Sequence, residues 1–361
     1  MKSDDKTSHN SPSIRFPEFT GEWKYFSIND VCSEFKSGKN IKADLISSNG
    51  NFPVYGGNGL RGYTSSYNHD GLYVLIGRQG ALCGNVRSVF GKIYITEHAI
   101  AVAGNEKSDT NFLHYLFLKM NLGQYSDQSA QPGLAVNKLL KLKVLLPSIS
   151  EQIKIAKLLS LLDERIAVQN RLIEKLQSLI GGIAQHCIKE AISGSMGIKL
   201  GDICKITTGK LDANAQVDNG LYPFFTCAEQ PFKIDNFAFD TEALLISGNG
   251  ANLGYVNYYN GKFNAYQRTY VLDAFSENIQ YIKWALKVLL PKRIAIEKSS
   301  SNTPYIVLST LSDLRLPIPS KGNQCHMAEL MQSLERKLSN QIALKSSYNM
   351  LKQYLLRQMF I

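Results

Sequence analysis

The chain has 361 residues, of which 44% are hydrophobic and 19% are charged. This length suits two domains of ordinary size, and this composition excludes a wholly disordered chain. No apolar run reaches the ~20 residues that a membrane-spanning helix needs, and residues 1–13 are polar and lack the apolar core of a secretion signal. We therefore expect a soluble, cytoplasmic protein that begins with a short disordered leader.

Charge and cysteine content narrow the class further. Lysine and arginine number 40 against 30 acidic residues, a net charge of +10. This excess favours polyanionic partners such as nucleic acid, although ordinary soluble proteins also carry it. The six cysteines are far apart, with no CxxC pair and no histidine at ligand spacing. The sequence therefore predicts buried, reduced thiols and neither a disulfide framework nor a zinc site.

An internal repeat organises the chain, which matches itself at a shift of 170–172 residues. Residues 74–86 align without a gap on residues 244–256 and share Leu, Ile, Gly, Ala, Gly and Val with them. Residues 142–148 (LKVLLPS) likewise match residues 314–320 (LRLPIPS). The repeat predicts two homologous domains, and the glycine-containing segment predicts a strand, a turn and a second strand in each.

The leader, residues 1–22, is followed by the first copy of the repeat. Residues 23–148 and 195–320 contain short β-branched and aromatic runs broken by Gly, Asn and Ser, a pattern typical of β-rich domains. Each domain has one predicted helix, around residues 111–122 and 278–290, where apolar residues recur at helical spacing.

A heptad repeat follows each β-rich domain, at residues 149–194 and 321–361. Steps of four and three residues between seam positions predict an α+β fold in which the two long helices pair as an antiparallel coiled coil, although such stripes can also pack a bundle. The predicted seam includes Leu159, Leu162, Ile166, Gln169, Ile173, Leu176, Met331, Leu334, Leu338 and Gln341. The two glutamines share one seam position, so we expect their amides to meet midway along the pair. Two exposed glutamines at the seam edge are the alternative.

The sequence contains no convincing catalytic motif. The sequence has no phosphate-binding glycine loop, no dinucleotide fingerprint and no Asn/Asp-Pro-Pro-Tyr run. Glu34 and Lys36 resemble the loose acidic pattern of metal-dependent nucleases, but no second acidic ligand stands at a suitable spacing. The sequence alignment of the two copies also replaces this pair with Ile206 and Thr208. We therefore expect no catalytic site, cofactor or metal in this chain.

Basic and amide side chains around the glycine turns suit DNA. Arginine and lysine fit guanine edges and phosphates, and asparagine and glutamine fit adenine edges. His98 is included because it aligns with Arg268, whereas His114 in a predicted helix has a structural role. The DNA-binding candidates are Lys39, Asn58, Arg61, Arg78, Gln79, Lys92, His98, Lys210, Asn249, Asn252, Lys262, Gln267 and Arg268. Only some are expected to touch DNA, because polar loop residues are usually just solvated.

The two domains differ in charge. Residues 23–150 carry 13 basic and 8 acidic residues, and residues 197–320 carry 12 and 11. If both bind DNA, the second depends more on local placement than on net charge.

Over nearly its whole length the chain resembles the specificity subunit of type I restriction–modification systems. Its leader at residues 14–23 (IRFPEFTGEW) is similar to the Arg-Phe-Pro-Glu-Phe leader of those subunits. The repeated order of domain, proline, Glu-Gln and helix is also theirs, with Pro147 before Glu151 and Gln152 in the first copy. The second copy departs from this order, because it has Asn323 before Gln324.

The resemblance implies two target-recognition domains that each read one half of a split sequence in double-stranded DNA, with the helices as a ruler between them. It also implies two methyltransferase subunits docked on the helices, joined by restriction and translocase subunits. Adenine methylation and ATP-dependent cleavage, with S-adenosylmethionine, ATP and Mg²⁺, would then belong to those partners.

Two other classes of function stay open. One is a tandem-repeat adaptor for a glycan or a protein, which loop aromatics such as Tyr63, Tyr67, Tyr258 and Tyr259 would also suit. Steep loss of binding with rising salt would distinguish DNA from a glycan. The other is a self-sufficient nuclease, which would cleave DNA without a partner in the presence of a divalent metal.

Overall fold

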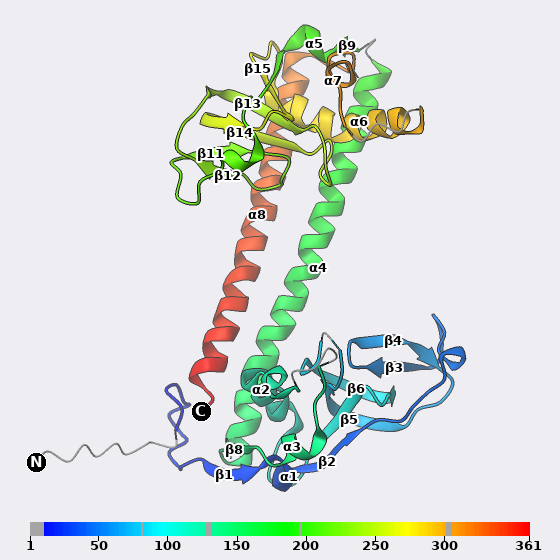
Figure 1. Cartoon of the computed structure of the whole chain (residues 1–361), viewed down its shortest axis with the longest axis vertical. Coiled ribbons are helices and arrows are strands. Elements are labelled where there is room, and N and C mark those ends of the chain that lie inside the picture. Colours follow the sequence, from blue (N-terminus) through cyan, green and yellow to red (C-terminus); the bar gives the residue numbers. More distant parts are fainter. Residues whose placement is uncertain (1–10, 81, 128–131, 195–196, 301–304) are drawn as a thin grey trace, which may run out of the picture. The chain divides into compact units, whose positions relative to one another are not determined.

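A computed structural model describes residues 11–80, 82–127, 132–194, 197–300 and 305–361, without the side chains of residues 298–300. Most of the predicted disordered segment, residues 1–13, lies outside this range. The chain divides into two compact units, Met1–Gln169 with Leu344–Ile361, and Asn170–Ala343 (Figure 1). Within the described residues, no helix has the length and apolar character needed to cross a membrane.

The first unit is built on a six-stranded sheet. The strands of the whole unit are β1 (Lys24–Ser27), β2 (Cys32–Ser37), β3 (Phe52–Gly56), β4 (Gly59–Thr64), β5 (His69–Gly77), β6 (Val86–Ile95), β7 (Ala99–Gly104) and β8 (Lys143–Leu146). Its helices are α1 (Ile28–Val31), α2 (Thr110–Met120), α3 (Val136–Leu140) and the start of α4 (Ile149–Ser193). The sheet order is β2-β7-β5-β6-β3-β4, and β1 pairs separately with β8.

Buried residues lie on both faces of this sheet. One face packs against α2 and the start of α4 in a core that includes Phe112, Ile155 and Leu159. The other encloses a smaller cluster around Leu75 and Ile93.

The second unit repeats this plan. Its strands are β9 (Ile198–Lys199), β10 (Lys205–Thr208), β11 (Tyr222–Phe225), β12 (Phe232–Ile234), β13 (Phe239–Ser247), β14 (Val256–Ala265), β15 (Thr269–Asp273) and β16 (Arg315–Leu316). Its helices are α5 (Leu200–Ile203), α6 (Ile279–Ser300), α7 (Leu308–Ser312) and most of α8 (Lys321–Gln358). The sheet order is β10-β15-β13-β14-β11-β12. The predicted α+β fold, two tandem β-rich domains each followed by a long helix, is confirmed.

The predicted helices inside the two domains are present as α2 and α6, but α6 continues past the expected end at residue 290. Pro291 lies within it and removes one backbone hydrogen bond. Side-chain contacts stabilise the turn after Pro291. Ile294 is buried in the core of the unit, and Glu297 accepts hydrogen bonds from Arg293 of the same helix (2.6 Å) and from Thr310 of α7 (2.7 Å). Packing therefore overrides the local preference to stop.

The two long helices contact each other within each unit. In the first, Leu159 of α4 shares a core with Leu356 and Met359 of α8. In the second, Ile180 of α4 shares a core with Met331 of α8. The start of one helix thus meets the end of the other, which is the contact order of an antiparallel pair.

The remaining seam residues follow the same face. Leu162 packs against the first core, and Leu334 and Leu338 pack against the second. Ile173, Leu176 and Gln169 are buried, and Ile166 and Gln341 are half-buried. Gln169 belongs to the first unit and Gln341 to the second, so their meeting remains a prediction.

The cysteines are free thiols, but the prediction that all are buried is wrong. Cys204 is buried, Cys325 is exposed, and the other four are intermediate. Cys325 is the fifth residue of α8, among the polar residues of its first turns, and that polar setting accounts for its exposure.

Candidate nucleic-acid interface

The loops that carry most candidate residues are held by one backbone frame, repeated in both units. The Arg78 amide donates to the His98 carbonyl at 2.9 Å, and the Gly248 amide donates to the Arg268 carbonyl at 2.9 Å. A second pair of bonds, Gly84 to Gly77 (2.7 Å) and Gly254 to Ser247 (2.8 Å), closes the turn after β5 and β13. The repeat therefore preserves the path of the backbone and not only its sequence.

Glycine is needed in these turns. Gly80 and Gly84 have φ values of +85° and +82°, and Gly250 and Gly254 have +79° and +83°. L-residues with a side chain rarely adopt this conformation. A Cβ at Gly84 would also lie 2.1 Å from the backbone nitrogen of Gly123.

In the first unit, His98 and Gln79 form the centre of the loop cluster. His98 Nδ1 lies 3.0 Å from Gln79 Oε1, and His98 Nε2 lies 3.1 Å from Glu97 Oε1. The His98 side chain is 45% exposed. Beside it, the β3–β4 turn approaches so closely that a Cβ at Gly57 would lie 2.7 Å from the His98 carbonyl oxygen. This contact brings the exposed Asn58 to the same cluster.

Two further exposed cations border this cluster. The Lys39 amide donates to the Ile95 carbonyl at 3.0 Å, three residues before His98. The Arg61 side chain lies against Gly56, where a Cβ would be 2.8 Å from Arg61 Cδ. The backbone of Lys39, the Arg61 side chain and the His98–Gln79 pair thus lie around the same loops of the first sheet.

In the second unit, Gln267 and Arg268 are exposed and line a cavity of about 470 Å³ with Thr208, Tyr270 and Tyr305. The Tyr270 hydroxyl donates to the Ile306 carbonyl at 2.9 Å and fixes one wall. Asn249 forms an isolated backbone bridge with Tyr305. The exposed Lys210 lies two residues after Thr208, the last residue of β10, which lines this cavity.

The structure places three candidates apart from these clusters. Lys92 and Lys262 lie within β6 and β14, with their ammonium groups 5.0 Å and 4.7 Å from the ring centres of Tyr67 and Phe237. The Asn252 amide donates to the Cys227 carbonyl at 3.0 Å and thereby supports its own loop. These side chains already have partners within the domain.

Two exposed residues near these loops, Arg87 and Tyr305, are not among the candidates expected from the sequence. Arg87 is exposed on β6 and reaches the β3–β4 hairpin, where a Cβ at Gly59 would lie 2.9 Å from its Nη2. Tyr305 is 46% exposed. Arg87 lies within β6 and Tyr305 lies before α7, outside the glycine turns from which the candidates were drawn.

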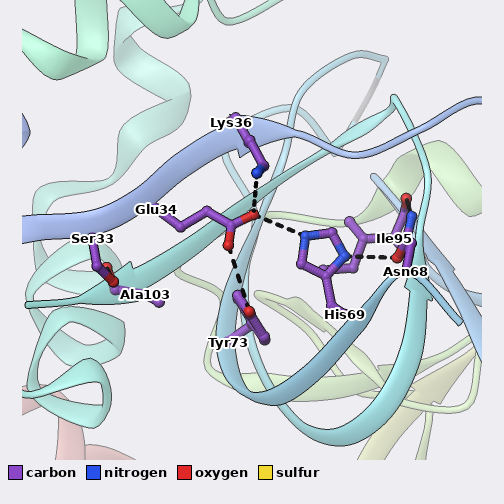
Figure 2. A network of polar contacts seen from close by, with 8 residues as sticks. All are labelled: Ser33, Glu34, Lys36, Asn68, His69, Tyr73, Ile95 and Ala103. Atoms are coloured by element: carbon purple, nitrogen blue, oxygen red, sulfur yellow. Dashed lines mark hydrogen bonds and ion pairs between the residues drawn. The ribbon is translucent and has the colours of Figure 1, made fainter.

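Glu34 belongs to a polar network between β2 and β5 (Figure 2). Its carboxylate lies 2.9 Å from Nε2 of the buried His69 and 3.2 Å from the ammonium group of Lys36. His69 Nδ1 lies 2.6 Å from Asn68 Oδ1, which also accepts from the Ile95 amide at 2.8 Å. Desolvation by burial, and to a smaller extent the nearby Glu34 carboxylate, raises the pKa of Tyr73.

This network gives Glu34 a role in holding strands together. Among the described residues, no group of three or more His, Cys, Asp or Glu side chains could hold a metal ion. The alignment of Glu34 with Ile206 is wrong, because a β-bulge between Cys32 and Glu34 adds one residue to β2. Strand register instead matches Glu34, opposite Ala103, with Lys205, opposite Asp273.

The leader is bound to the first turn of α4. Arg15 donates from Nε and Nη2 to the two carboxylate oxygens of Glu151, both at 2.7 Å. Glu151 is 1% exposed, and its hydrogen bonds raise the pKa of Arg15. Lys154 pairs with Glu18 and lies 4.6 Å from the ring centre of Phe16. The leader motif therefore has a structural role at the start of α4, and Asn323 replaces Glu151 at the matching position of α8.

Comparisons with known proteins agree with this architecture. The family model described as type I restriction modification DNA specificity domain matches residues 20–178 and 193–345. The EcoprrI type I restriction enzyme specificity subunit of Escherichia coli is 42% identical over 154 residues, which are 42% of this chain and 38% of that protein. The chain thus aligns with well under half of that relative.

Two Mycoplasma genitalium comparisons cover more of the chain. A putative type I specificity subunit, S.MgeORF438P, is 24% identical over 92% of both chains. The crystal structure of a type I restriction–modification S subunit from M. genitalium superposes with a TM-score of 0.75 at 20% identity, over 97% of this chain and 99% of that one. The repeated frame and the two matched regions together show that this chain belongs to the type I restriction–modification DNA specificity domain family.

Proposed function

We propose that this chain is the DNA-reading subunit of a type I restriction–modification complex and that each unit reads one half of a split target. The observation that carries the proposal is the repeated loop frame with different side chains on it. Arg78 and His98 stand where the second unit has Gly248 and Arg268. One backbone with two sets of hydrogen-bonding groups is what recognition of two different half-sequences requires.

The exposed side chains divide by chemistry. Lys39, Arg61 and Lys210 carry full charges on flexible stems and suit phosphates, which position the protein without reading sequence. Gln79 and Gln267 present an acceptor and a donor, the pair that an adenine edge matches. Arg268 presents the two parallel donors that fit guanine. Each unit can therefore both hold the duplex and discriminate between bases.

The long helices serve as the spacer and as a docking face. Leu161, Val168, Leu172 and Leu179 are 38–51% exposed on α4, at spacings of seven, four and seven residues. This stripe lies outside the seam with α8 and has heptad spacing of its own, which suits a second helical partner. We assign it to the methyltransferase subunits, which would supply S-adenosylmethionine chemistry, with ATP-dependent restriction by further subunits. The chain alone would then neither methylate nor cleave DNA.

The test is the salt dependence of duplex binding by this chain co-purified with its methyltransferase. Neutralising six or more phosphates should reduce affinity on the order of 10³-fold between 50 and 200 mM salt. An affinity for DNA that does not change with salt, together with binding of a glycan, would favour the adaptor function instead.

A further inference from the structure

Gln152 joins the first recognition domain to its long helix. It is fully buried in the first turns of α4. Its Oε1 accepts from the amide of Asp109 at 2.9 Å, and its Nε2 donates to the carbonyls of Lys107 (2.9 Å) and Pro147 (3.0 Å). Asp109 is itself the N-cap of α2. One side chain thus binds the start of the domain helix and the strand end that leads into α4.

We call this connection between a recognition domain and its long helix a joint. Gln324 forms the joint of the second unit and is 1% exposed. Its Oε1 accepts from the amide of Asn278 at 3.0 Å, and its Nε2 donates to Glu277 (2.6 Å) and to the Pro319 carbonyl (3.0 Å). Asn278 accepts from the amides of the first turn of α6, as Asp109 does for α2. An amide side chain both accepts and donates, whereas an ionised carboxylate only accepts, and this fits the recurrence of the glutamine although the preceding residue changes from Glu151 to Asn323.

A second hydrogen bond connects each domain helix to its long helix, about three turns further along the long helix. Asp163 of α4 accepts from the Tyr115 hydroxyl of α2 at 2.9 Å. Glu335 of α8, at the matching position of the repeat, accepts from the ammonium group of the buried Lys283 of α6 at 2.7 Å. The donor differs between the units, but each domain helix is bound to its long helix at two separated points. Two such points fix an angle, which a single point does not.

We propose that Gln152 and Gln324, supported by Asp163 and Glu335, are positioning residues that set how many base pairs the protein accepts between its two half-sites. This inference rests on the proposed function. Successive base pairs are about 3.4 Å apart along the helix axis. A small rotation at either joint would therefore move one set of reading loops onto the neighbouring base pair.

The experiment uses the full chain with its methyltransferase subunits and three duplexes. All carry the two half-sites selected by the wild-type complex, with a spacer of the selected length or one base pair shorter or longer. Gln152→Met and Gln324→Met keep the length of the side chain and remove its hydrogen bonds. Gln177→Met and Gln332→Met, at exposed positions of α4 and α8, are the matched controls.

We expect each joint variant to reduce the affinity ratio between the selected and the altered spacers by about tenfold, while the half-site sequences stay unchanged. Both controls should keep the wild-type ratio. Equal weakening on all three duplexes would show a merely structural role and overturn the inference. Failure of the wild-type complex to select any split motif would instead overturn the proposed function.

Tyr115→Phe provides a milder variant in case the methionine variants do not fold. It removes one hydroxyl and keeps the ring, so the fold should persist. We expect the spacer ratio to fall about threefold. An unchanged ratio for a folded Tyr115→Phe, together with an unchanged ratio for Lys283→Met, would contradict the proposal.

Discussion

The two recognition sheets share strand order and hydrogen-bond frame but differ inside. In the first, His69 opposes Ile93 across β5 and β6 and is bound to Glu34. In the second, Phe239 opposes Phe263 at the same register, and their rings stack at 5.1 Å. A buried polar network in one sheet is thus replaced by an aromatic cluster in the other.

This difference shows what the fold fixes and what it leaves free. The turns need glycines with positive φ and a few backbone bonds, and both units keep them. The side chains that fill the sheet and those that line its loops can change without altering the frame. Divergence of the readers is therefore compatible with one architecture.

The largest expected effect is a loss of unfolding stability confined to the unit whose core is changed. Phe263→Ala should destabilise the second unit by about 4 kcal/mol, because it removes the ring that contacts Phe225, Phe239 and Tyr259. The matched change in the first unit, Ile93→Ala, should cost about 3 kcal/mol. Hydrogen exchange measured along the full chain reports each unit separately. Equal loss of protection in both units after either change would show that the interiors are not independent.

Glu34→Ala should cost the first unit about 2 kcal/mol, because it leaves the buried His69 without its carboxylate. Glu34 is itself partly exposed, so we place the cost below that of a fully buried pair. The control is Lys205→Ala at the matching, exposed position of the second sheet, which should change stability by less than about 0.5 kcal/mol. The denaturant midpoints of the two variants measure this difference, and similar midpoints would contradict the assigned role of Glu34.

Much of this architecture could be predicted from local pattern. Heptad spacing gave the long helices, and glycine turns between apolar runs gave the β5–β6 and β13–β14 pairs. The contact of Glu34 with His69 could not be predicted, because it joins residues 35 positions apart with no periodic signal. The bulge in β2 likewise shifted the alignment of Glu34 by one residue without changing composition.

The candidate interface was predictable in part, for a related reason. His98 and Gln79 stood beside turn signals, and the structure brings them together at 3.0 Å. Lys92 and Lys262 stood close to glycines as well, but side-chain direction within a strand turns them toward aromatic rings instead. Which loop residues converge depends on tertiary packing, which spacing along the chain does not encode.

At the reading loops, His98→Ala and Arg268→Ala should each weaken binding by about 2 kcal/mol at one half-site only. Both side chains are at least partly exposed, so stability should stay unchanged. Binding to duplexes with one half-site altered at a time measures the effect. Loss at both half-sites from a single substitution would contradict the division of labour between the units.

A gradual effect of pH on stability is also expected. Burial, with a smaller contribution from Lys352, lowers the pKa of His114 from 6.5 to about 4. The unfolded chain binds this proton first, so the free energy of unfolding of the first unit should fall by about 1 kcal/mol per pH unit from pH 6.5 to 4. His114→Gln should remove that slope, and His326→Gln, at an exposed position of α8, should keep it. An unchanged slope in His114→Gln would assign it to another group.

Selection from a randomised duplex pool would show whether the two units are different readers on one repeated frame. The probe is the full chain co-purified with its methyltransferase, in wild-type form and as His98→Ala and Arg268→Ala. We expect one split motif with a fixed spacer, in which each substitution relaxes a different half. A single undivided motif, two identical half-sequences, or no motif at all would contradict it.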